Sequence, residues 1–224
     1  MEKTLNFLKK LKKNNNRDWF QENKSEYIQS NEEMIAFADQ LLERMDSFDK
    51  IETVSGKKSL YRIYRDVRFS PNKQPYKTNR SGSFRRKGAD RRGGYYFSIE
   101  PGNTMVGGGF YQPNKEDLEL IRRHIEMDAD PLHAVLNEKN FKRFYGPLQG
   151  EQLKTVPRGF NKEDPNIELL RYKNFYTMHQ FSDKDVLADD FVDQVASAYK
   201  QLLSYFQVMT DFLTTNLDGE SLIG

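Results

Sequence analysis

Apolar residues near the N-terminus recur every three or four positions, a spacing typical of amphipathic helices. They predict one helix over residues 4–13, a second that Asn16 caps, and further helical structure to about residue 46. The same spacing from 186 to 213 predicts one long C-terminal helix whose apolar face packs on the core. Both ends of the chain are therefore expected to be helical.

The middle of the chain favours strands. Residues 95–100 and 104–111 flank a Pro-Gly-Asn turn, in which proline fixes φ and glycine can adopt positive φ, so we predict a β-hairpin. Alternating apolar positions predict another strand over 174–181. We expect one α+β domain over residues 1–224, with helices from both termini packed on a small, mainly antiparallel sheet.

Between these elements the pattern is less regular. Residues 60–67 are compatible with a helix by spacing and with a strand by composition. Residues 70–94 contain two prolines, four glycines and dense basic charge, which predicts a long irregular loop. Loops longer than about 12–15 residues are usually functional or mobile. Asn114 can cap a helix to Ile125, and 146–166 should be another loop.

Composition narrows the possible classes of protein. Aromatic residues make up 13% of the chain, which excludes a disordered protein and predicts a sizeable aromatic core. The chain has no cysteine, which excludes disulfides and thiolate chemistry, and its three histidines lie in separate segments. We therefore predict no metal site and no cofactor. Without a long apolar run or a signal peptide, we expect a cytoplasmic protein that does not associate with membranes.

Charge is distributed unevenly along the chain. Between Lys57 and Arg92 there are 13 basic residues and two acidic ones, a net charge of +11, although the whole chain carries only +2. The remaining residues are therefore net acidic. A segment of this kind attracts anions, so it is the first candidate for a binding site.

Guanidinium, ammonium and hydroxyl groups, which recognise phosphate and carboxylate, are interleaved within this segment. We predict that it binds an anion through Arg62, Arg65, Arg68, Lys73, Lys77 and Arg80, joined by Arg158 from a later loop. Tyr76 or Tyr96 could offer a stacking face. In the alternative interpretation, Asp66 holds Arg65 or Arg68 in an internal ion pair that only braces the loop.

Two other motifs have mainly structural interpretations. Gly107-Gly108-Gly109 resembles a phosphate cradle, but Glu116 and Asp117 begin the following helix and would repel a bound anion. Close backbone packing is the favoured explanation. His179 lies in the alternating strand 174–181, where a lone histidine is usually a hydrogen-bonded core group.

Several motifs together resemble those of the domain of unknown function 2461 family. They are Asn14-Asn15-Asn16-Arg17-Asp18-Trp19-Phe20, Arg62-Ile63-Tyr64-Arg65-Asp66-Val67-Arg68-Phe69-Ser70, Pro75-Tyr76-Lys77-Thr78, Tyr95-Tyr96, Gly107-Gly108-Gly109-Phe110-Tyr111, Arg122 and Pro157-Arg158-Gly159-Phe160. The resemblance covers nearly the whole chain. It implies a single-domain, mostly bacterial cytoplasmic protein, and it implies no particular activity.

These observations leave three hypotheses for the function. The first is a protein that binds a phosphate-bearing or other anionic ligand, nucleic acid included, through the 57–92 segment. The second is an enzyme that acts on an anionic small molecule, with the same arginines and Arg158 orienting the substrate and an acid such as Asp66 acting as base. The third is a structural module that binds a protein partner. The sequence does not predict an oligomeric state.

Overall fold

The computed structural model describes residues 1–223. They divide into two compact units, each assembled from three separate stretches of chain. The first unit contains Met1–Phe84, Tyr96–Val106 and Gln180–Ala198, and the second contains Arg85–Tyr95, Gly107–His179 and the residues from Tyr199 onward.

Helices occupy both ends of the chain, as the apolar spacing predicts. The helices are α1 (Glu2–Lys13), α2 (Arg17–Glu22), α3 (Lys24–Met45), α4 (Gly56–Ser59), α5 (Lys115–Met127), α6 (Asp130–Asn137), α7 (Lys139–Tyr145), α8 (Ile167–Leu170), α9 (Asp183–Val186), α10 (Phe191–Gln201) and α11 (Leu203–Thr214). Two predicted caps are present: the Asn16 side chain accepts from Trp19 N at the start of α2, and Asn114 accepts from Asp117 N at the start of α5.

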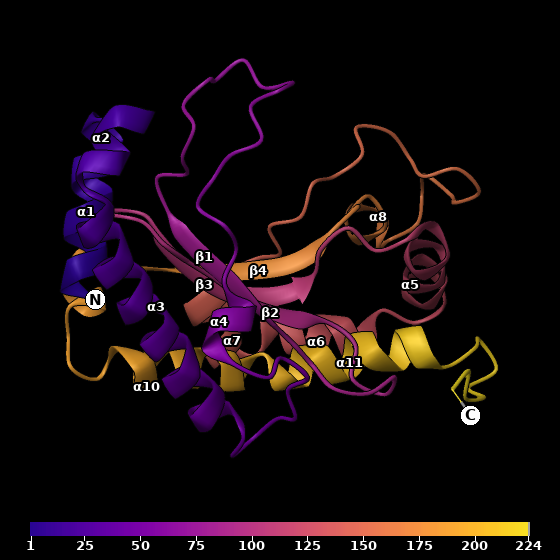
Figure 1. The fold of residues 1–224 in the computed structure, drawn as a ribbon. Coiled ribbons are helices and arrows are strands. Elements are labelled where there is room, and N and C mark those ends of the chain that lie inside the picture. The colour runs from indigo at the N-terminus through magenta and orange to yellow at the C-terminus, as the bar shows by residue number, and fades with distance from the viewer. Residues whose placement is uncertain (224) are drawn as a thin grey trace. The chain divides into compact units, whose positions relative to one another are not determined.

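Four strands form one antiparallel sheet in the order β1-β2-β3-β4 (Figure 1). They are β1 (Arg80–Arg85), β2 (Gly94–Ile99), β3 (Thr104–Phe110) and β4 (Phe175–Phe181). The predicted hairpin and the predicted strand over 174–181 are confirmed, and so is the α+β class. In the hairpin turn Gly102 has φ of 76°, a conformation that side chains with a Cβ rarely adopt.

The core of the first unit is aromatic and is assembled from distant segments. Phe37 of α3 lies edge-on to Phe97 of β2, with ring centroids 5.6 Å apart, and stacks on Phe191 of α10 at 5.4 Å. All three rings are buried. Helix α3 therefore completes the burial of its apolar face at Phe37 only when later parts of the chain are in place.

The second unit has a core of its own around Tyr95 of β2. Its ring lies 4.8 Å from that of Tyr199 and 5.0 Å from that of Phe206. The buried Tyr205 hydroxyl donates to the carbonyl oxygen of Phe175 at 2.9 Å. The aromatic core predicted from composition is thus present in each unit.

Two sequence-based predictions are wrong in detail. Residues 70–94 are not loop throughout, because β1 begins at Arg80, although serines and a glycine give it little intrinsic strand preference. A Cβ at Gly82 would lie 2.5 Å from the Phe97 ring and 2.7 Å from the Ser59 carbonyl, so close packing selects glycine there. The C-terminal region predicted as one helix consists of α9, α10 and α11.

Candidate functional site

The loop that leads into β1, residues 61–79, is called the basic loop here. Its two ends pair as an antiparallel ribbon: Tyr61 N donates to Ser81 O, Lys77 N to Ile63 O and Arg65 N to Pro75 O, at 2.8–2.9 Å. The ribbon ends in a tip, residues 66–74, and Figure 1 shows the loop reaching away from the start of β1. The ambiguous segment 60–67 is therefore extended chain, not helix.

An aromatic cluster fixes the base of the basic loop on the N-terminal helices. Ile63 and Tyr76 are buried in it with Phe7, Leu8, Leu11 and Phe20. Tyr76 stacks on Phe20 with ring centroids 4.0 Å apart and planes 10° from parallel. Tyr76 is 2% exposed, so its predicted role as a stacking face for a ligand is wrong: its ring is already stacked within the protein.

Arg80 is a buried cation at the end of the ribbon. Its side chain donates to Asn31 Oδ1 at 2.5 Å and to the Tyr61 carbonyl at 3.3 Å, and its guanidinium carbon lies 5.8 Å from the centre of the Tyr27 ring. Within residues 1–223, Arg80 pairs with no carboxylate and its Nε has no hydrogen-bond partner. Burial lowers the pKa of Arg80 from its ordinary value, yet an arginine remains charged.

Arg62 and Arg80 both lie close to Lys77. The pKa of Lys77 is lowered first by burial and then by the positive fields of Arg62 and Arg80. Its ammonium nitrogen lies 5.8 Å from the centre of the Tyr61 ring. Three cations are therefore grouped at the base of the basic loop, and none of them has an ion pair among the described residues.

At the tip, unlike at the base, an arginine is paired with a carboxylate. Arg68 and Asp66 form an ion pair at 2.7 Å, with side chains 76% and 44% exposed, so the alternative of an internal brace is wrong. An exposed pair of this kind contributes little to stability, typically about 0–1 kcal/mol. Lys73 donates to the carbonyl of Val67 at 3.0 Å and closes the tip.

Asp66 is poorly suited to the role of general base. The hydrogen bonds from Arg68 lower its pKa, and the charge of Arg62 lowers it further. A carboxylate with a lowered pKa is a weaker proton acceptor at neutral pH.

The remaining predicted site residues lie elsewhere. Arg65 is half-buried in the ribbon, and Tyr96 is half-buried on β2. Arg158 belongs to the second unit, where it is exposed in the loop between α7 and α8. Of the predicted cations, the structure thus groups Arg62, Lys77 and Arg80, and it places Arg68 and Lys73 at the tip.

Sequence reasoning missed the residues that hold this group in place. Asn31 and Tyr27 of α3 contact Arg80 from about fifty positions away, and no local pattern marks them. Arg17 of α2 also lies near the ribbon: burial raises the pKa of Tyr76, and the charge of Arg17 opposes that rise.

The glycine run and His179 have structural roles, as their patterns indicate. A Cβ at Gly107 would lie 2.0 Å from the Thr177 carbonyl, and one at Gly108 would lie 2.6 Å from that of Gly94, so neighbouring strands approach too closely for any side chain. The His179 ring stacks on Phe144 at 3.8 Å, and its Nδ1 lies 2.7 Å from the Phe144 carbonyl oxygen.

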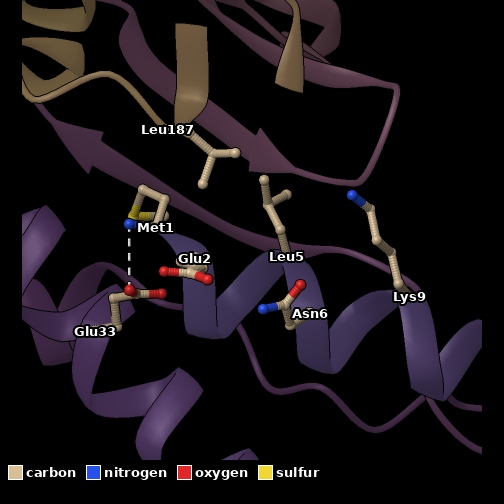
Figure 2. A pocket seen from close by; sticks show the side chains of 7 residues that line it. All are labelled: Met1, Glu2, Leu5, Asn6, Lys9, Glu33 and Leu187. Carbon is tan, nitrogen blue, oxygen red and sulfur yellow. Dashed lines mark ion pairs between the residues drawn. The ribbon is translucent and has the colours of Figure 1, made fainter. Parts of the chain in front are cut away.

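A separate pocket of about 530 Å³ lies in the first unit between α1, α3 and the segment after α9 (Figure 2). It is lined by Met1, Glu2, Leu5, Asn6, Lys9, Glu33 and Leu187. The Met1 amino group pairs with Glu33 at 3.1 Å, and Glu33 also accepts from the Thr4 hydroxyl. Most charged groups that line this pocket already take part in ion pairs, and no residue predicted for anion binding lines it.

No group of three or more histidine and carboxylate side chains in residues 1–223 is arranged to hold a metal ion. None of the helices among these residues combines the length and apolar character needed to cross a bilayer.

Comparison with known proteins places the chain by sequence alone. Searches among curated proteins and among solved structures find no match. A family model described as a conserved hypothetical protein, DUF2461, matches residues 3–207. The match covers most of the chain, including the N-terminal helices, the basic loop and the sheet, and so this protein belongs to the DUF2461 family.

Proposed function

We propose that this protein binds a phosphate-bearing ligand at the base of the basic loop, through Arg62, Lys77 and Arg80. Lys77 and Arg62 provide positive charge at the surface, and the buried Arg80 provides positive charge from the interior. Phosphate is the best match, because it carries more than one negative charge and several acceptor oxygens for converging donors.

The observation that carries this proposal is the buried guanidinium of Arg80 with no carboxylate beside it. A buried charge is normally paired, since removing it from water is costly. Here Lys77, a second cation, lies close enough for Arg80 to lower its pKa, and this repulsion makes the cost larger. An anion would neutralise all three, which gives the arrangement a physical reason that folding alone does not supply.

The surroundings of the site support recognition of an anion. The carboxylate of Glu100, directly after β2, accepts hydrogen bonds from the Thr78 hydroxyl at 3.0 Å and from Asn103 at the turn. The Tyr61 ring, 45% exposed, borders Lys77 and limits its hydration. Cations in partly dehydrated surroundings attract anions more strongly than fully solvated ones.

Inorganic pyrophosphate is a suitable probe. At low ionic strength it should raise the melting temperature of the protein in a concentration-dependent way, because a ligand that binds only the folded state stabilises it. In Lys77→Met, the affinity from calorimetric titration should fall at least about tenfold, the scale of one charge-assisted contact.

Lys139→Met is the matched control, because Lys139 is exposed at the start of α7 and its loss changes the net charge equally. It should bind pyrophosphate like the parent. The proposal is wrong if pyrophosphate leaves the melting temperature unchanged, or if both variants lose affinity to the same extent.

A further inference from the structure

The basic loop exposes aromatic rings as well as cations. Phe69 at the tip is 94% exposed, Tyr64 on the ribbon is 49% exposed, and Tyr61 is 45% exposed. Arg68 lies beside the Phe69 ring, with its guanidinium carbon 5.9 Å from the ring centre. Exposed apolar residues scattered singly over a surface are ordinary, but here three aromatic side chains share one loop.

The Tyr64 ring is held at the edge of the aromatic cluster. Tyr64 is bridged to Tyr76 in the antiparallel ribbon, so the two side chains lie on the same side of it, and their ring centroids are 5.3 Å apart. The Tyr64 ring also lies 6.1 Å from that of Phe20, between centroids, and the two ring contacts limit its freedom. Tyr64 therefore presents a fixed, half-exposed aromatic ring two residues from the exposed cation of Arg62.

From this arrangement we infer that the phosphate-bearing ligand is a single-stranded nucleic acid that runs along the basic loop. The inference rests on the proposed function, since the phosphates would be bound by Arg62, Lys77 and the cations of the tip. Unpaired bases would stack on Phe69 and Tyr64. Proteins that bind single strands combine these two features, a basic track and aromatic platforms.

A mononucleotide fits the arrangement less well than a polymer. Phe69 belongs to the tip, and Lys77 lies at the base beyond the paired residues Arg65 and Pro75. Extended chain advances about 3.3 Å per residue, so a ligand that contacts both ends of the loop must span several nucleotides. A duplex fits less well too, because its bases are already stacked and paired and offer no free ring faces.

The tip is also a poor membrane anchor. Around Phe69 it carries the Asp66–Arg68 pair, Asn72, Lys73 and Gln74, and it forms no helix in the described chain. Membrane-surface binding relies on an amphipathic helix or several apolar anchors, and a single phenylalanine among polar groups offers little apolar area.

The test uses fluorescein-labelled dT20 and the full chain, measured by fluorescence anisotropy at about 50 mM salt. The parent should bind dT20 more tightly than a 20-base-pair duplex, and log affinity should fall with log salt by about 0.7 for each phosphate contacted. Phe69→Ala should weaken dT20 binding at least about fivefold, because stacking contributes about 1–3 kcal/mol per base. Because the Phe69 side chain is exposed, we expect Phe69→Ala to fold like the parent.

Val54→Ala is the matched control, since Val54 is also an exposed apolar residue, at 83%, and lies outside the basic loop. It should bind dT20 like the parent. The inference is overturned if Phe69→Ala binds dT20 normally, if the duplex binds more tightly, or if phosphatidylserine vesicles bind more tightly than dT20 in a Phe69-dependent way. Pyrophosphate binding that depends on Lys77 would in each case leave the proposed function standing.

Discussion

Lys77 is the residue whose ionisation reports most directly on the basic loop. Burial and the charges of Arg62 and Arg80 lower its pKa from the ordinary value of 10.5. Below the lowered pKa, Lys77 is protonated in both the folded and the unfolded state. The burial and repulsion of its charge then reduce the free energy of unfolding by their full amount. Between that pKa and about 10.5 the folded state releases the proton first, so this contribution to the free energy of unfolding becomes more favourable as pH rises.

Lys77→Met should therefore be as stable as the parent or slightly more stable at pH 7, by up to about 0.5 kcal/mol. Its advantage should shrink as the pH approaches 10.5. Denaturant unfolding of both proteins at pH 7 and at several values from pH 9 to 10.5 would measure the difference. A variant clearly less stable than its parent at pH 7 would show that the Lys77 ammonium has a stabilising partner.

At the scale of single residues, the sequence predicts the charge of the candidate side chains better than it predicts where each of them lies. The excess of basic residues singled out Arg62, Lys77 and Arg80 among the candidates, because net charge can be read without coordinates. It could not separate the buried Arg80 from the exposed Arg68, since the neighbouring residues in the sequence do not mark which arginine is buried. Burial depends on Asn31 and Tyr27, which reach Arg80 only after the chain has folded.

Among the structural elements, the junction between α1 and α2 positions the basic loop. Asn15 lies in this junction and pairs with Tyr76 as a neighbouring strand would: its Nδ2 donates to Tyr76 O at 3.0 Å, and its Oδ1 accepts from Tyr76 N at 3.1 Å. One side chain thus satisfies both polar backbone groups of a buried residue.

Asn15→Ala should cost about 1–3 kcal/mol, because it leaves a buried donor and acceptor without partners. It should also speed hydrogen exchange at the ribbon amides of Arg65 and Lys77. Asn14→Ala is the control, since exposed Asn14 only donates to the Lys10 carbonyl on its own helix. Equal losses of stability in the two variants, measured by chemical denaturation, would contradict the role given to Asn15.

Most elements were predictable because periodicity and caps are local signals. Neighbouring residues alone predict the apolar face of α1, the Asn114 cap and the 95–111 hairpin. Strand β1 was missed because Arg80 to Arg85 contains no β-branched residue, and its pairing with β2 compensates for that. The interruption after α9 was missed because apolar spacing continues across residues 187–190, which are not helical.

At the scale of the whole molecule, the first unit depends on segments that are far apart in sequence. Residues 1–84 contain α1 to α4, the basic loop and most of β1, but not Phe97 or Phe191, which cover Phe37. A fragment of residues 1–84 should therefore show no cooperative thermal transition by circular dichroism, while the full chain should show one. A fragment that melts cooperatively would mean that the N-terminal segment holds a sufficient core of its own.

The same discontinuity affects the protein during its synthesis. A ribosome adds about 5–20 residues per second, so on the order of 10 s separates the emergence of Phe84 from that of Ala198, the last residue of the first unit. Throughout that interval the apolar face of α3, with Met34, Phe37 and Leu41, has no complete core to enter. Nascent chains of this protein are therefore expected to be clients of ribosome-associated chaperones, and slower translation would lengthen their exposure.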